Sequence, residues 1–482
     1  MQCRRSSLVR ALLVVLGLAL LADRVVAHQL ATRFDVPVPL PWLFAGAGAT
    51  VAVTALLLAG GRSVPDARRR LGSLPSAVAR PLTVVARATF FAAFVAVLWV
   101  GVTGTPTPGA NFATLFVWPV WLKGVALLAI LAGSPWRVLS PWRTAYDALC
   151  RLEESEVRLR EYPARLGTWP AFVGFLLLVG VGENLTRLPS LPAGTAVLVA
   201  GYALVMLLGG LAFGPTWFDR ADPLAVFYRL LGRAAPLSVT RESDGGLTVV
   251  ARVPWRDCRR PVADRATAAL VVAAVYTVSF DGFAESPEYV GLHLGVQRFL
   301  GVGPSISVLL YLLGLAGFLV CFWLVVCSVS WVGRIEGREG VDVAGDGGTA
   351  ESLALALAPT LLPIAAGYEV AHNYGYSLTF LGRLPVTAGA TPVDLLDWLP
   401  LSAFWASQVS LIVLGHVVAV VAAHAVVARL VGDPAPDRGK TAQGRTESAS
   451  SSVTLRAHAP LTVLMVGYTV LSLWIISRPL AG

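Results

Sequence analysis

Ten long runs of apolar residues recur along this 482-residue chain, separated by shorter polar segments. Each run has about 20 residues, the length of an α-helix that crosses roughly 30 Å of hydrocarbon. The pattern therefore predicts an all-α integral membrane protein with about ten transmembrane helices. The runs cover residues 41–60, 82–101, 112–133, 168–186, 193–213, 264–282, 305–332, 353–374, 403–429 and 459–477.

The first 27 residues have the pattern of a secretory signal peptide, with three arginines within the first ten residues, a short apolar core and small residues at 25–27. Cleavage after Ala27 would make His28 the first residue; an uncleaved signal anchor is the alternative. The rest divides into a nine-span membrane domain over 28–430, a flexible cytoplasmic linker over 431–458 and a last transmembrane helix within 459–482. Two cytoplasmic loops, 134–167 and 214–263, interrupt the nine-span domain.

Charge supports the same picture and adds an orientation. Only 14% of the residues are charged, against roughly 25% in soluble proteins. The net charge of +9 comes mainly from arginines in alternate loops, whereas the loops between them are nearly free of positive charge. This matches the positive-inside rule with both termini outside. We therefore expect a multi-pass protein of the plasma membrane whose partner is the lipid bilayer, with no role for nucleic acid.

The loop over 214–263 contains two β-prone runs, 237–240 and 247–253, around Asp244-Gly245-Gly246. An Asp-Gly turn between two such runs is typical of a hairpin. We expect a small cytoplasmic β-hairpin there.

The loop over 134–167 repeats Ser-Pro-Trp-Arg, at 134–137 and again at 140–143. Tryptophan and arginine at the end of a span usually anchor the helix in the membrane interface. Interface anchoring is therefore the expected role, and a helix that docks a partner is the alternative.

Three of the six histidines lie inside predicted spans: His372, His416 and His424. An ionisable side chain is costly in hydrocarbon and usually marks a functional site. Glu369 precedes His372 by three residues, so the two share one helix face. On the predicted topology His28, Asp281, Glu369 and His372 lie at the outer side with His416 below them, whereas His424 lies about 12 Å deeper than His416.

These positions suggest an outward-facing transition-metal site, copper first and zinc second, because nitrogen donors suit copper(II). The predicted metal ligands are His28, Glu369, His372 and His416, with Asp281 as a ligand or as an orienting carboxylate. Hydrogen bonding between helices is the competing explanation for each intramembrane histidine.

Lys123 lies midway along the third predicted span. A lysine buried at this depth needs a carboxylate partner or access to water. Glu183, Asp281 and Glu369 are the candidate partners. Extension of the side chain to the interface, or a shifted span boundary, is the alternative.

Several short stretches resemble a group of prokaryotic polytopic membrane proteins named fenitrothion hydrolase. The stretches are Ala27-His28 with 35–39 (Asp-Val-Pro-Val-Pro), 140–143, 280–282 (Phe-Asp-Gly), 362–364 with Ala371-His372, 414–416 through His424, and 465–467 (Met-Val-Gly). The resemblance implies a membrane protein and a phosphotriester hydrolase activity, with His372, His416 and His424 matching the group's histidines.

The sequence favours a membrane protein that binds or moves a transition metal at its outer face. A membrane-bound, metal-dependent phosphotriester hydrolase would use the same residues, with metal-activated water as nucleophile. Haem ligation by His372 and His416 is a third hypothesis, and a structural subunit is a fourth. Catalytic residues are not assigned, because no Walker, GxSxG or HExxH pattern is present.

Overall fold

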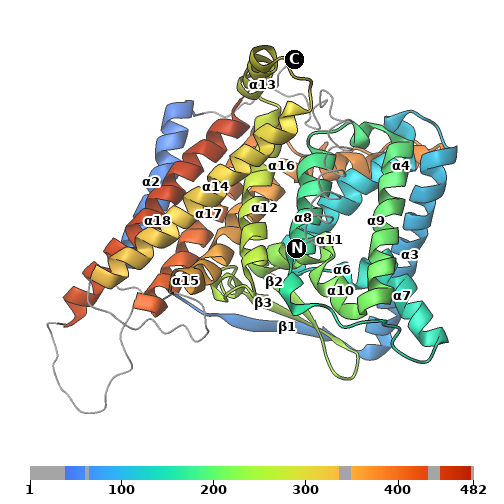
Figure 1. Ribbon diagram of the computed structural model, residues 1–482, viewed down its shortest axis with the longest axis horizontal. Helices are drawn as coiled ribbons and strands as arrows, with labels where there is room; N and C mark the ends of the chain where they lie inside the picture. Colours follow the sequence, from blue (N-terminus) through green and yellow to red (C-terminus); the bar gives the residue numbers. More distant parts are fainter. Residues whose placement is uncertain (1–37, 60–63, 336–348, 432–445, 479–482) are drawn as a thin grey trace, which may run out of the picture.

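The computed structural model describes residues 38–59, 64–335, 349–431 and 446–478 (Figure 1). This part of the chain contains ten helical segments that are long and apolar enough to cross a membrane. They confirm the predicted all-α membrane architecture, and each overlaps one of the predicted runs. The predicted signal peptide and His28 lie outside the described residues.

Several spans are built from more than one helical element. The bounds are α2 (Leu40–Ala59), α3 (Ser76–Thr103), α4–η2–α5 (Phe112–Phe116, Val117–Gly124, Val125–Ala132), η3–α8–η4 (Ala164–Leu166, Trp169–Phe175, Leu176–Glu183), α9 (Pro192–Phe213), α12 (Arg265–Ala284), α14 (Ile306–Ile335), α15–η8–α16 (Thr349–Leu357, Ala358–Leu361, Leu362–Arg383), α17 (Leu401–Val431) and α18 (Thr446–Ile476). Shorter helices are α6 (Trp136–Leu139), α7 (Pro141–Leu152), α10 (Pro215–Arg220), α11 (Pro223–Leu231) and α13 (Pro287–Leu300). Helix α18 thus extends into the segment predicted as a linker.

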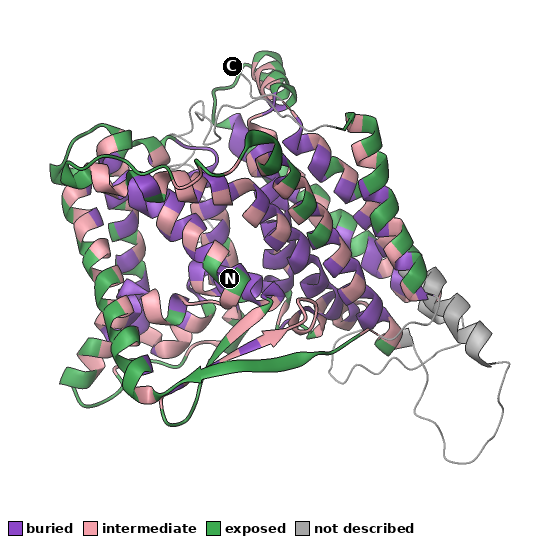
Figure 2. Ribbon diagram, turned by 180° about the vertical axis from the view of Figure 1, so that it is seen from behind, coloured by how far each residue is buried: buried purple, intermediate pink, exposed green. Residues whose placement is uncertain are grey.

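The spans differ greatly in how far they are buried within the protein. Of the most apolar stretch of α12, 83% is buried, whereas the corresponding value for α3 is 11%. Figure 2 shows the buried residues gathered on the central helices and the exposed ones on the outer helices. In a membrane, a helix can expose apolar side chains to lipid, so a low buried fraction indicates contact with the bilayer. Helix α12 is therefore the centre of the bundle, and α3 is part of its lipid-facing wall.

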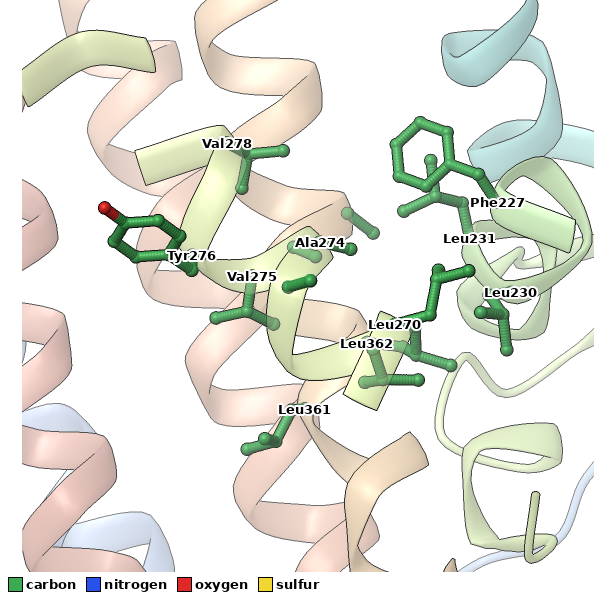
Figure 3. Close-up of a cluster of buried hydrophobic side chains, with 14 of the residues drawn as sticks. Phe227, Leu230, Leu231, Leu270, Ala274, Val275, Tyr276, Val278, Leu361 and Leu362 are labelled. Atoms are coloured by element: carbon green, nitrogen blue, oxygen red, sulfur yellow. The ribbon is translucent and has the colours of Figure 1, made fainter. Parts of the chain in front are cut away.

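The apolar core is densest around the first half of α12. In Figure 3, Leu270 of α12 lies between Leu231 of α11 and Leu362 at the start of α16, and all three are fully buried. Short side chains such as Ala274 let the neighbouring helices approach α12 closely. This packing holds the first half of α12 against α11 and α16.

The start of α12 is fixed by its N-cap residue, Asp264. Its carboxylate accepts hydrogen bonds from the backbone N–H of Thr267 at 2.7 Å and of Thr168 at 2.9 Å. Burial alone would raise the pKa of Asp264, but these hydrogen bonds and those from the two threonine hydroxyls hold the pKa below its ordinary value. The cap thereby joins α12 to the start of the fourth span.

Helices α16 and α17 cross at a pair of glycines. A Cβ on Gly367 would lie 2.6 Å from the carbonyl oxygen of Leu411, and one on Gly415 would lie 2.6 Å from that of Pro363. Only glycine permits so close an approach of two backbones. The crossing places Glu369 and His372 on α16 beside the helix that carries His416.

A three-stranded antiparallel sheet lies at the opposite end of the bundle from α13 (Figure 1). Strands β2 (Leu237–Arg241) and β3 (Leu247–Arg252) form the predicted hairpin, and the Asp244 carboxylate accepts a 2.8 Å hydrogen bond from the Gly246 N–H at its turn. The third strand, β1 (Arg68–Leu74), is exposed along its whole length and pairs with β3. The sequence did not predict β1, because this segment lacks the alternation of apolar and polar residues that is typical of a half-buried strand.

The repeated Ser-Pro-Trp-Arg motif has a different role from the one expected. The indole N–H groups of Trp136 and Trp142 both donate to Oδ2 of Asp222, at 3.0 and 2.8 Å, and Tyr202 donates to Oδ1 at 2.5 Å. Each indole is only 1% exposed, so neither tryptophan anchors the lipid interface. Burial raises the pKa of Asp222, although the hydrogen bonds from Tyr202, Trp136 and Trp142 act in the opposite direction. The repeat supplies two donors to one buried carboxylate.

Candidate functional site

Lys123 lies on η2, a π-helical segment within the third span. A π-helix leaves backbone carbonyls without their usual helical donors and is common at functional sites. The Tyr228 hydroxyl of α11 donates to two of these carbonyls, at 3.0 Å to Leu122 and 3.2 Å to Trp121. Trp118 adds a second anchor, because its indole donates to the Thr195 hydroxyl of α9 at 3.0 Å. Both contacts hold the wide turn that directs Lys123 into the bundle.

Glu183 ends a second π-helical segment, η4, in the fourth span. Here too nearby side chains satisfy the carbonyls of the wide turn. The Asn184 amide donates to Val179 at 2.7 Å, and the Thr186 hydroxyl donates to Gly182 at 2.6 Å. Lys123 and Glu183 therefore both depend on a local departure from α-helical geometry.

The remaining ionisable groups come from regular helices. Asp281 lies near the end of α12, and Glu369 and His372 lie one turn apart on α16. The sequence predicted that these two α16 residues would face the same side. Four different spans thus contribute polar groups to one region of the interior.

These side chains meet around one ammonium group. Lys123 Nζ lies 3.1 Å from Glu183 Oε1, 3.7 Å from Asp281 Oδ2 and 3.9 Å from Glu369 Oε1. The ring of His372 extends the group, with Nε2 at 3.4 Å from Asp281 Oδ2. We call these five residues the Lys123 cluster. All three carboxylates named as candidate partners of Lys123 are therefore partners, and the lysine does not extend to the interface.

The Lys123 cluster is buried and carries more acid than base. The Asp281 side chain is 18% exposed, and the other four side chains are 7% exposed or less. One ammonium faces three carboxyl groups, which leaves two negative charges if all of them ionise and His372 is neutral. Oε2 of Glu183 and of Glu369 also lacks a hydrogen-bond partner among the described residues. Such a charge excess in a low-dielectric interior is costly until a cation joins it.

His416 and His424 lie on α17 and are not members of the Lys123 cluster. Nδ1 of His416 lies 2.9 Å from the carbonyl oxygen of Ile412, and since that oxygen can only accept, Nδ1 is the donor. The His416 ring packs against Tyr468, with ring centres 5.7 Å apart, and its Nε2 has no hydrogen-bond partner among the described residues. His424 is buried further along α17. Of the five predicted metal ligands, the structure brings Asp281, Glu369 and His372 together, and His28 is not described.

A metal ion requires several donors around one point. Within residues 38–59, 64–335, 349–431 and 446–478, no three side chains of His, Cys, Asp or Glu are arranged so that they could hold one ion. Asp281, Glu369 and His372 supply donor types that zinc and copper accept, but the Lys123 ammonium lies among the carboxylates. The copper or zinc site remains a prediction.

Comparison with known proteins adds no relative: no family model, no curated protein and no solved structure matches this chain. The resemblance to the fenitrothion hydrolase group therefore remains a prediction from the short stretches that suggested it.

Lys123 and Glu183 were absent from the predicted set of site residues. The signal was present in both cases, since each is an ionisable residue within an apolar run. Histidines and the nearby Glu369 suggested a metal site, whereas a lysine opposite several carboxylates indicates charge pairing. Tyr228 carried no such signal, because its part in holding η2 depends on the packing of α11.

Replacing Tyr228 by phenylalanine should lower the free energy of unfolding by about 1–2 kcal/mol, because two buried carbonyls lose their donor. Thermal unfolding in detergent micelles measures the change. Tyr289→Phe is the matched control, since the buried Tyr289 hydroxyl has no hydrogen-bond partner among the described residues. Equal losses in the two variants would show that Tyr228 does not support the turn.

Proposed function

We propose that this protein is a proton-coupled membrane transporter in which the Lys123 cluster is the proton-binding site. The observation that carries the proposal is the unequal charge of the cluster, three carboxyl groups against one ammonium. A purely structural lysine would be neutralised by a single carboxylate. The two additional carboxyl groups are costly to bury unless they take up and release a cation.

The members of the Lys123 cluster differ in exposure, and this difference suggests a route for the proton. Asp281 is its most exposed member and lies near the end of α12, toward the side of the bundle that carries α13. His372 contacts Asp281, and Glu369 lies one turn away on the same helix. A proton that enters at Asp281 would therefore meet an imidazole and then a fully buried carboxylate. Chains of Asp, Glu and His of this kind form proton relays in pumps and transporters.

The test is infrared difference spectroscopy of the purified protein in lipid bilayers, titrated with acid. We expect the carbonyl band of a protonated, buried carboxylic acid, and we expect Glu369→Gln to remove it or reduce it. Glu288→Gln is the control, because Glu288 is 41% exposed and pairs with Arg478 outside the cluster. Absence of any such band that depends on Glu183, Asp281 or Glu369 would overturn the proposal.

A second candidate is the transition-metal function, for which the observation is the contact between His372 and Asp281 with Glu369 one turn away. Copper or zinc would bind after Lys123 moves aside, and the hydrolase hypothesis would use the same residues with metal-activated water. The same infrared experiment separates the two candidates. Added zinc or copper(II) should displace the bound proton and abolish the acid band only if the metal binds at the Lys123 cluster.

A further inference from the structure

A cavity of about 520 Å³ lies between α12, α14, η8–α16 and α18, away from the Lys123 cluster. Its volume falls within the range of about 300–1,000 Å³ that is usual for ligand pockets. Its inner wall consists of buried apolar side chains, among them Phe322, Ile364 and Met465. The cavity is therefore large enough for a ligand, and its lining favours hydrocarbon.

The cavity opens through the lipid-facing wall of the bundle. Its lining includes Gly317 and Cys321 on α14, and Val463, Gly467 and Leu471 on α18, all of which are exposed. Each set follows a four-residue spacing and so forms one stripe along its helix. Both helices are membrane-spanning segments, so the molecules that meet this opening are the lipids of the bilayer.

Two glycines, Gly317 and Gly467, lie at the mouth of the cavity. A Cβ on Gly317 or on Gly467 would meet no atom within 4 Å. These glycines therefore do not serve a close helix contact, unlike Gly367 and Gly415. A larger side chain at either position would extend into open space at the cavity mouth without a clash.

The lining also restricts the chemistry of the occupant. Tyr468 supplies a hydroxyl, but that hydroxyl donates to the Val275 carbonyl at 2.9 Å and contacts the Ser279 hydroxyl at 2.5 Å. No charged side chain of the described residues lines the cavity. Water in such a space would lack the two to four polar partners that it needs. A hydrocarbon chain requires none.

We propose that this cavity is a lateral binding site for one acyl chain of a bilayer phospholipid. The chain enters between α14 and α18 and lies against the ring of Tyr468. Because that ring packs on His416, the bound chain forms part of the wall that separates His416 from the bilayer.

The test uses the full-length protein in liposomes that contain a phospholipid with a diazirine group on one acyl chain. After irradiation, mass spectrometry locates the cross-linked residues. We expect cross-links at Phe322 and Met465, which are buried and so cannot be reached by lipid that merely surrounds the protein. Gly317→Leu and Gly467→Leu should abolish these cross-links, because leucine fills the entrance.

Gly201→Leu is the matched control. Gly201 is an exposed glycine of α9 that lies outside the cavity, and a Cβ added to it would also meet no atom within 4 Å. This variant should retain the cross-links at Phe322 and Met465, and all three variants should keep the thermal stability of the parent. Cross-links confined to exposed residues would overturn the proposal. Displacement of the cross-links by an equimolar isoprenoid quinone would overturn its assignment to a phospholipid chain.

Discussion

Replacing Lys123 by methionine should lower the free energy of unfolding by about 3–5 kcal/mol, the cost of leaving a buried charge without its partner. Methionine preserves most of the side-chain volume, so the loss reports charge rather than a cavity. The ammonium has three carboxylates within 4 Å, and all three lose this contact in the variant. Equilibrium unfolding in mixed detergent micelles measures the change. Lower pH should reduce the loss, because protonation neutralises the stranded carboxylates.

A double-mutant cycle provides the control for this prediction. Glu183→Gln removes the carboxylate nearest to Lys123, at 3.1 Å. The combined Lys123→Met/Glu183→Gln variant should therefore be more stable than the sum of the single losses predicts, with a coupling of about 0.5–3 kcal/mol. Additive losses would mean that the two groups do not interact, and they would contradict the cluster as described.

Replacing Asp222 by alanine should destabilise the protein by at least about 3 kcal/mol, because several buried donors lose one acceptor at once. The carboxylate receives hydrogen bonds from Trp136, Trp142 and Tyr202, and from the N–H groups of Leu224 and Ala225 at the start of α11. The loss should appear as a lower thermal midpoint together with a changed tryptophan emission, since two indoles lose the same partner.

Glu156→Ala is the control for Asp222→Ala. Glu156 is 53% exposed and pairs at 3.8 Å with Arg158, which is itself 52% exposed. Exposed ion pairs usually contribute about 0–1 kcal/mol, so this variant should change stability little. If the two variants behave alike, Asp222 is not the centre of the tryptophan pair.

The sequence was sufficient for the architecture, and it pointed to every residue of the Lys123 cluster, although it assigned three of the five to a metal site. Apolar runs located all ten spans, because length and hydropathy decide which helices cross a membrane. The cost of burying an ammonium led to the three carboxylate partners of Lys123. Glu369 and His372 share a face, as helical spacing required.

What the sequence missed depends on contacts between distant segments. The wide turns of η2 and η4 leave no pattern in the chain, because their stability comes from Tyr228, Asn184 and Thr186. The sequence predicted Trp136 and Trp142 as interface anchors, because it could not show that both indoles donate to Asp222. The sequence indicated the depth of His416 in the membrane, but it could not show that the ring of His416 packs on Tyr468.

The pairing of β1 with β3 has a consequence for synthesis of the protein. Arg70 of β1 contacts Thr248 of β3, a residue 178 positions later in the chain. At about 5–20 residues per second, the ribosome needs roughly 10–40 s to make that distance. Throughout this interval β1, which lies between α2 and α3 in the chain, has no partner strand. Its three consecutive arginines repel the same strand of a second copy, and they therefore oppose pairing between two chains before β3 is made.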